Sequence, residues 1–120
     1  QQLDCMPSNA TTPAVNQLPY SVGHGSDTAV SDNYKHGKIT VQAYSPLGSG
    51  SVLSDPDVIS IGKAHNKSSA QVALRWIIQR NATFTTSAST LQHFQQDLDI
   101  FDFELSEEEM KTLNWKKATF

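Results

Sequence analysis

Short β-type segments alternate with helix-type segments along this sequence, and the alternation limits the folds that the chain can adopt. Three runs predict strands: residues 13–18 (a buried strand ended by Pro19), residues 39–44 and residues 82–87. Helices are expected at residues 28–36, 56–65 and 69–80, within 90–98, and after Ser106. Strands that alternate with helices in this way are typical of a parallel sheet whose strands are joined by crossover helices.

The expected helix starts carry side chains that can satisfy free backbone N–H groups. Asp55 precedes Pro56, which pairs a capping carboxylate with a proline suited to the first helical position. The segments 68–71 and 106–109 have the Ser-x-x-Gln and Ser-x-x-Glu spacing of capping boxes. Asp27 is the expected cap of the 28–36 helix. These local signals fix where most of the helices should begin.

The 69–80 segment has the strongest helical pattern in the chain. Its apolar residues fall on one face at 3.6-residue spacing, with Trp76 at the edge of that face, in the core or at an interface. Arg75 and Arg80 are expected to lie in solvent. The 82–87 run, in contrast, is rich in threonine, which favours a strand but gives up apolar burial. It therefore predicts looser packing than a central parallel strand normally has.

Three parallel strands alone leave both edges of a sheet open and one face without a covering layer. The sequence therefore predicts a slice of a larger sheet or barrel that does not fold stably as a monomer. Residues 13–120 are expected to form this portion. Residues 1–12 are expected to be the end of a preceding helix or a disordered lead.

Composition excludes several classes of function. The net charge of −3 and the absence of a basic patch argue against nucleic-acid or anionic-membrane partners. No apolar run is long enough for membrane insertion, and the first ten residues lack the pattern of a signal peptide. We therefore expect a soluble cytoplasmic or organellar protein rather than a secreted one. Cys5 is the single cysteine, and the four histidines lack metal-ligand spacing, so no metal site is expected and the histidines should be exposed.

Four segments resemble the C-terminal part of aldo-keto reductases, in the order and at nearly the spacing of that family. They are PAVNQ at 13–17, AYSPLGSG at 43–50, SSAQVALRWIIQR at 68–80 and DLDIFDFELSEEEMKTL at 97–113. The resemblance implies a partial (β/α)8 TIM barrel, in which this chain supplies the three C-terminal βα units, strands six to eight. It also implies an NADP(H)-dependent oxidoreductase whose site lies at the carboxyl ends of the strands.

The resemblance implies cofactor contacts at nine positions. Tyr44 matches the tyrosine that stacks on the nicotinamide ring, and Gln17 matches the residue that binds the carboxamide. The pyrophosphate loop and the adenine end are matched by Ser45, Leu47, Ser49, Ser87, His93, Gln96 and Asp97. The adenine end lacks the lysine and arginine that hold the 2′-phosphate in the family, which predicts weaker preference for NADPH over NADH. Without the resemblance, the Tyr-Ser-Pro-Leu-Gly turn is better explained as a strand end that packs on a neighbour.

No residue of this chain matches the catalytic aspartate, tyrosine, lysine and histidine of the family, which come from earlier strands. Two functions therefore remain open. The chain is either part of a reductase that converts aldehydes and ketones to alcohols, or a catalytically inactive, reductase-derived structural or interaction subunit, a truncated pseudoenzyme. Either requires a partner for the open strand edges, namely the N-terminal half of the barrel or another protein.

Overall fold

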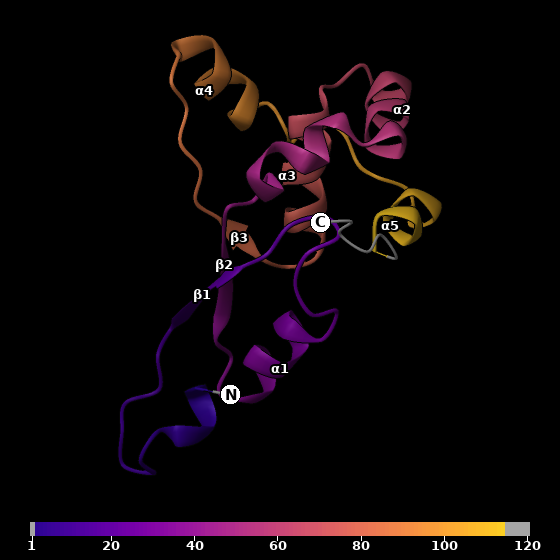
Figure 1. Cartoon of the computed structure of the whole chain (residues 1–120). Coiled ribbons are helices and arrows are strands. Elements are labelled where there is room, and N and C mark those ends of the chain that lie inside the picture. Colours follow the sequence, from indigo (N-terminus) through magenta and orange to yellow (C-terminus); the bar gives the residue numbers. More distant parts are fainter. Residues whose placement is uncertain (1, 115–120) are drawn as a thin grey trace.

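The computed structural model describes residues 2–114 and contains one parallel sheet (Figure 1). Its strands lie in the order β1 (Val15–Pro19), β2 (Thr40–Tyr44) and β3 (Thr83–Phe84). Pro19 is the register partner of Tyr44, and Ala43 is the partner of Phe84. The predicted parallel sheet is confirmed, and the carboxyl ends of its strands meet at one edge.

Helices connect and follow the strands as the alternation predicts. They are the 3-10 segments η1 (Gln2–Cys5) and η2 (Gly48–Ser54) and the α-helices α1 (Ala29–Lys35), α2 (Pro56–His65), α3 (Ser69–Gln79), α4 (Leu91–Leu98) and α5 (Glu107–Asn114). Asp55 caps α2 by accepting from the N–H groups of Asp57 and Val58. Ser68 and Gln71 form a reciprocal capping box on α3. Ser106 and Glu109 form a second box, so the three capped starts are confirmed.

Several local expectations were wrong. The first strand is not buried: its side chains are exposed or half-buried, because β1 is an edge strand whose open face no described residue covers. The third strand spans two residues rather than 82–87, because only Thr83 and Phe84 pair with β2. The N-cap of α1 is Thr28, not Asp27, and its side chain makes no capping hydrogen bond.

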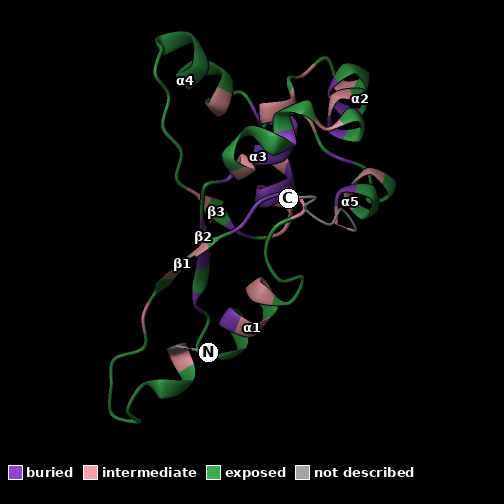
Figure 2. Ribbon diagram, viewed as in Figure 1, coloured by how far each residue is buried: buried purple, intermediate pink, exposed green. Residues whose placement is uncertain are grey.

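The core lies between β2 and α3, where Figure 2 shows the buried segments. Val41 and Ala43 of β2 are fully buried on the face that the helices cover. Trp76 is 3% exposed, stacks on Tyr20 at a centroid distance of 5.3 Å, and donates to the Asn114 side chain. Trp76 is thus a core residue.

Two arginines and one histidine that were expected in solvent make side-chain hydrogen bonds within the fold. Arg75 is half-buried and donates to the Ile100 carbonyl. Arg80 donates to the Tyr20 hydroxyl and the Asp27 carbonyl. His65 lies 2.9 Å from Glu109 with 24% of its side chain exposed, whereas His24, His36 and His93 are exposed as expected. The predictions failed because the partners are far away in the sequence.

Candidate cofactor groove

A groove of about 440 Å³ lies at the carboxyl edge of the sheet. It is formed where the turn after β2 meets the segment after β3, and the Thr85 N–H donates to the Ala43 carbonyl at 2.9 Å to hold the two together. Its lining residues are Ser45, Pro46, Leu47, Ser49, Gly50, Thr85, Thr86 and Ser87. The parallel arrangement of β2 and β3 places these two distant segments side by side.

The turn after β2 has an unusual backbone. Ser45 and Ser49 have positive φ angles of 50° and 55°, and Gly50 has a φ of 90°. The Gly48 N–H donates to the Ser45 carbonyl, and the Gly50 N–H donates to the Leu47 carbonyl. Backbone N–H groups of a turn can form a concave site that suits an anion.

Gly48 allows this turn to approach its neighbours closely. A Cβ at this position would lie 3.1 Å from the Val52 side chain and 3.3 Å from the Ser21 Oγ. Ser21 is 1% exposed, and its buried hydroxyl has no hydrogen-bond partner among the residues that the structure describes. The turn is therefore packed against the segment that follows β1, on the side away from solvent.

Tyr44 and Gln17 lie on the open face of the sheet. Tyr44 is the last residue of β2 and is 42% exposed, so its ring is available at the edge that holds the groove. Gln17 is the register partner of Gln42, and its side-chain amide donates to the Gln42 side-chain oxygen at 2.9 Å. Because side chains alternate along a strand, Gln17, Gln42 and Tyr44 all project from the face opposite the helix-covered Val41 and Ala43.

Four of the sequence-predicted residues, Ser45, Leu47, Ser49 and Ser87, line the groove. The other predicted adenine contacts, His93, Gln96 and Asp97, lie on α4 outside that lining. Burial raises the pKa of Asp97, and the nearby His93 charge opposes this effect. The sequence analysis missed Thr85 and Thr86, although both follow β3 and parallel strands bring their carboxyl ends to one edge.

The donors of the groove fit part of a dinucleotide cofactor. Its hydroxyl groups, and the backbone of a turn whose residues have positive φ angles, suit a pyrophosphate. No lysine or arginine is among the residues that line it, so it offers no fixed cation to a 2′-phosphate. Over the part of the chain that the structure describes, no group of three His, Cys, Asp or Glu residues could hold a metal ion. None of the described helices is both long and apolar enough to span a membrane.

Known proteins match this sequence over most of its length. Residues 2–117 match the aldo/keto reductase family model. An aldo-keto reductase from Mycolicibacterium vanbaalenii is 39% identical over 103 residues, which are 86% of this chain and 37% of that relative. Aldo-keto reductase family 1 member A1-A from Danio rerio is 40% identical over 85 residues, which are 62% of this chain and 26% of that relative.

Solved structures share the arrangement of strands and helices. The aldose reductase from Schistosoma japonicum superposes with a TM-score of 0.77 and 32% identity, covering 90% of this chain and 36% of that protein. A Gox0644 mutant solved in complex with NADPH superposes with a TM-score of 0.82 and 26% identity, covering 88% of this chain and 39% of that protein. The chain thus spans well under half the length of these relatives. Its three βα units are part of a (β/α)8 barrel, and the chain belongs to the aldo/keto reductase family.

Proposed function

We propose that this chain forms the cofactor-binding C-terminal portion, residues 13–120, of an NADP(H)-dependent aldo-keto reductase that converts aldehydes or ketones to alcohols. The observation that carries the proposal is the groove at the carboxyl edge of the sheet, whose lining begins at Ser45, the residue that follows the exposed Tyr44. In α/β barrels this edge is where active sites lie. The family membership supports the reaction class.

Each residue of the site has a task that its chemistry suits. The exposed Tyr44 ring would hold the nicotinamide by stacking. Gln17, held by Gln42, presents its amide to the carboxamide. The turn 45–50, with its serine hydroxyls, would hold the pyrophosphate. When bound, the nicotinamide supplies the hydride, and this chain orients the nicotinamide ring. The proton donor comes from the rest of the barrel.

The adenine end is proposed to discriminate weakly between the two nicotinamide cofactors. Ser87 lies at the groove, and His93, Gln96 and Asp97 lie on α4, so the 2′-phosphate meets no fixed lysine or arginine in the groove. A doubly charged phosphate is held best by such cations. The open edges of β1 and β3 are covered by the N-terminal part of the same barrel.

The proposal is tested by NADPH fluorescence after the chain is combined with the N-terminal segment of an aldo-keto reductase such as the Mycolicibacterium vanbaalenii relative. We expect the assembled barrel to change the fluorescence of NADPH, and Tyr44→Ala to weaken binding about five- to ten-fold because stacking is lost. Tyr34→Ala, which alters an exposed tyrosine on α1, should leave binding unchanged.

Failure of an assembled barrel to bind NADPH would sink this proposal. Stable assembly without cofactor binding would favour the alternative, an inactive reductase-derived subunit that contributes structure or an interaction surface.

A further inference from the structure

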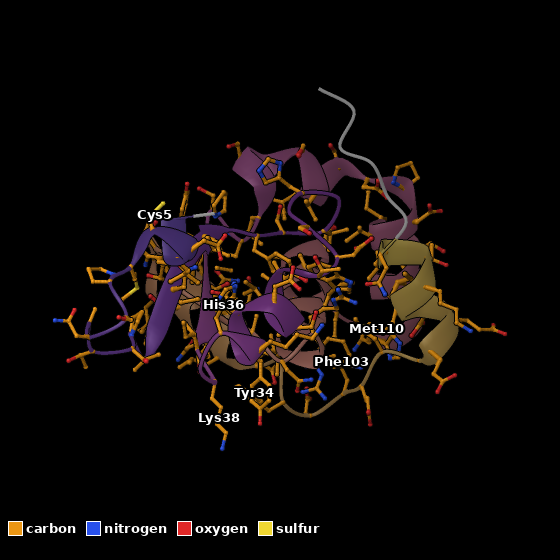
Figure 3. The ribbon with its side chains drawn as sticks, turned by 90° about the horizontal axis from the view of Figure 1, so that it is seen from below. Cys5, Tyr34, His36, Lys38, Phe103 and Met110 are labelled. Atoms are coloured by element: carbon orange, nitrogen blue, oxygen red, sulfur yellow. The ribbon has the colours of Figure 1, made fainter. Side chains whose placement is uncertain are left out.

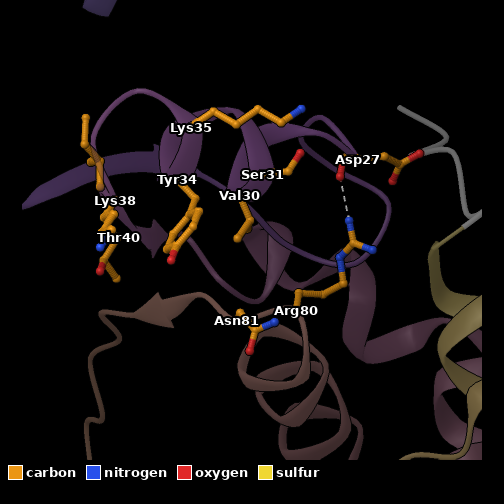
Figure 4. Close-up of a pocket in the computed structure, with 10 residues that line it drawn as sticks. Asp27, Val30, Ser31, Tyr34, Lys35, Lys38, Thr40, Arg80 and Asn81 are labelled. Carbon is orange, nitrogen blue, oxygen red and sulfur yellow. Dashed lines mark hydrogen bonds between the residues drawn. The ribbon is translucent and has the colours of Figure 1, made fainter.

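A second groove, of about 740 Å³, lies between α1 and the end of α3 (Figure 4). Its lining residues are Asp27, Val30, Ser31, Tyr34, Lys35, Lys38, Ile39, Thr40, Arg80 and Asn81. All of them lie within the described residues, and both walls come from this chain. No other chain is needed to form the groove.

This groove lies at the opposite end of the sheet from the cofactor groove. Thr40 begins β2 and Asn81 precedes β3, whereas Ser45 and Thr85 follow the same two strands. Thr40 and Ser45 are five residue steps apart along the strand, a span of about 16 Å at the usual rise per residue. A small molecule in one groove does not reach the other, so the second groove is a separate site.

Positive charge is concentrated in this groove. Three of the nine lysine and arginine residues of the chain, Lys35, Lys38 and Arg80, line it, although the chain carries a net charge of −3. Asp27 is the one acidic residue of the lining. Figure 4 shows Lys38 and Thr40 at one end, Arg80 and Asp27 at the other, and Tyr34 between them.

Arg80 is held in place for binding. Its Nε donates to the Tyr20 hydroxyl at 3.1 Å, and its Nη2 donates to the Asp27 carbonyl at 2.8 Å. Its guanidinium also lies 5.8 Å from the centre of the Trp76 ring. A guanidinium has five N–H donors, so these two bonds leave others for a ligand. Because the group is already ordered, a ligand meets little entropic cost there.

Apolar surface lies beside the charged groups. Val30 and the Tyr34 ring project from α1, and buried Ile39 forms part of the lining. Tyr34 is 61% exposed, and Figure 3 shows it projecting from the same surface as Lys38. An exposed ring next to fixed cations suits a ligand that combines a flat apolar body with an anionic group.

We propose that this groove binds a small organic carboxylate, with its carboxylate at Arg80 and Lys35 and its apolar body against Tyr34 and Val30. A single ordered guanidinium matches the two oxygens of a carboxylate. The Asp27 carboxylate at the same end disfavours a doubly charged phosphate. Binding here is independent of the nicotinamide cofactor.

The test uses 2-naphthoate as probe and titrates it into the protein at its natural length, followed by amide chemical shifts in NMR spectra. We expect shifts centred on residues 27–40 and 80–81 that persist with saturating NADPH. Asn81→Asp places a negative charge in the groove and should weaken binding about five-fold. Lys35→Gln removes a cation and should weaken it about three-fold.

Asn66→Asp is the matched control. Asn66, like Asn81, is exposed and left-handed, with φ angles of 56° and 59°, but it ends α2 outside the groove. This change should alter binding less than two-fold. The proposal would be overturned if neutral 2-naphthalenemethanol bound as tightly as 2-naphthoate. It would also be overturned if the two Asn→Asp variants weakened binding equally, or if NADPH displaced the probe.

Discussion

One side-chain pair joins two helices that are far apart in the sequence. The His65 Nε2 lies 2.9 and 3.0 Å from the two carboxylate oxygens of Glu109, which also accepts from the Ser106 N–H. Burial raises the pKa of Glu109, but hydrogen bonds from His65 and Ser106 outweigh it, so the pKa is lowered. The ionised carboxylate therefore stabilises the fold above its unfolded-state pKa, and this contribution is lost as pH falls through the lower folded-state pKa.

Replacing Glu109 by glutamine should reveal this contribution. At pH 6.5, Glu109→Gln should lower the free energy of unfolding by about 1 kcal/mol, because His65 and the N-terminus of α5 lose a charged partner. The difference in free energy of unfolding between the variant and the parent protein should shrink below about pH 4, where the carboxylate of the parent protein is protonated. Urea denaturation across pH, with the chain assembled with the N-terminal barrel segment, measures both. Glu108→Gln, at an exposed neighbouring position, is the control, and a deficit independent of pH would contradict the prediction.

Single residues show where sequence reasoning fails. Arg80 was expected in solvent, yet its partner Tyr20 lies 60 positions earlier in the chain. His65 bonds a residue 44 positions later. Neither contact leaves a local pattern, because each depends on how helices come together. The resemblance pointed to Tyr44 and the turn after it, since those residues form a continuous motif.

At the scale of elements, helices were easier to predict than strands. The start of α3 follows from Ser68 and Gln71, which satisfy each other's backbone N–H groups within four residues. β3 was expected over 82–87, but a strand exists only where a neighbour offers hydrogen bonds, and β2 pairs with two of these residues. A threonine-rich sequence indicates strand propensity, but it does not determine how many residues pair with a neighbouring strand.

The cap of α3 provides an element-scale test. Ser68→Ala should lower the free energy of unfolding by about 1 kcal/mol, because the Gln71 N–H loses its acceptor at the end of the most buried helix. Ser69→Ala changes the same side chain one position later, inside the helix, and should have less than half that effect. Thermal unfolding of both variants, each assembled with the N-terminal barrel segment, provides the comparison. Equal losses would mean that the box does not stabilise the helix.

At the scale of the whole molecule, apolar surface remains uncovered. Leu91, Phe94 and Leu98 of α4 are 72%, 54% and 58% exposed, and α4 buries no residue. The Cα radius of gyration is 15.1 Å, against about 13.6 Å expected for a compact domain of 120 residues. Figure 1 shows α4 and the N-terminal segment extending away from the core. This extended shape agrees with the prediction that the chain is a slice of a larger barrel.

The isolated chain should therefore not fold stably as a monomer. At low micromolar concentration we expect no cooperative thermal transition by circular dichroism, together with self-association in size-exclusion chromatography, because open strand edges and apolar surface favour aggregation. Adding the N-terminal barrel segment should restore a cooperative transition. A sharp transition of the isolated, monomeric chain would show the prediction to be wrong.

The position of β2 has a consequence for how the complete barrel is assembled. β2 is the central strand, and both of its neighbours belong to this chain. The backbone that carries Tyr44 is therefore aligned by hydrogen bonds made within the 120 residues. β1 and β3 each keep one edge for strands from elsewhere. The strands that complete the barrel pair with β1 and β3, so they act on the position of Tyr44 indirectly, through the pairing of β1 and β3 with β2.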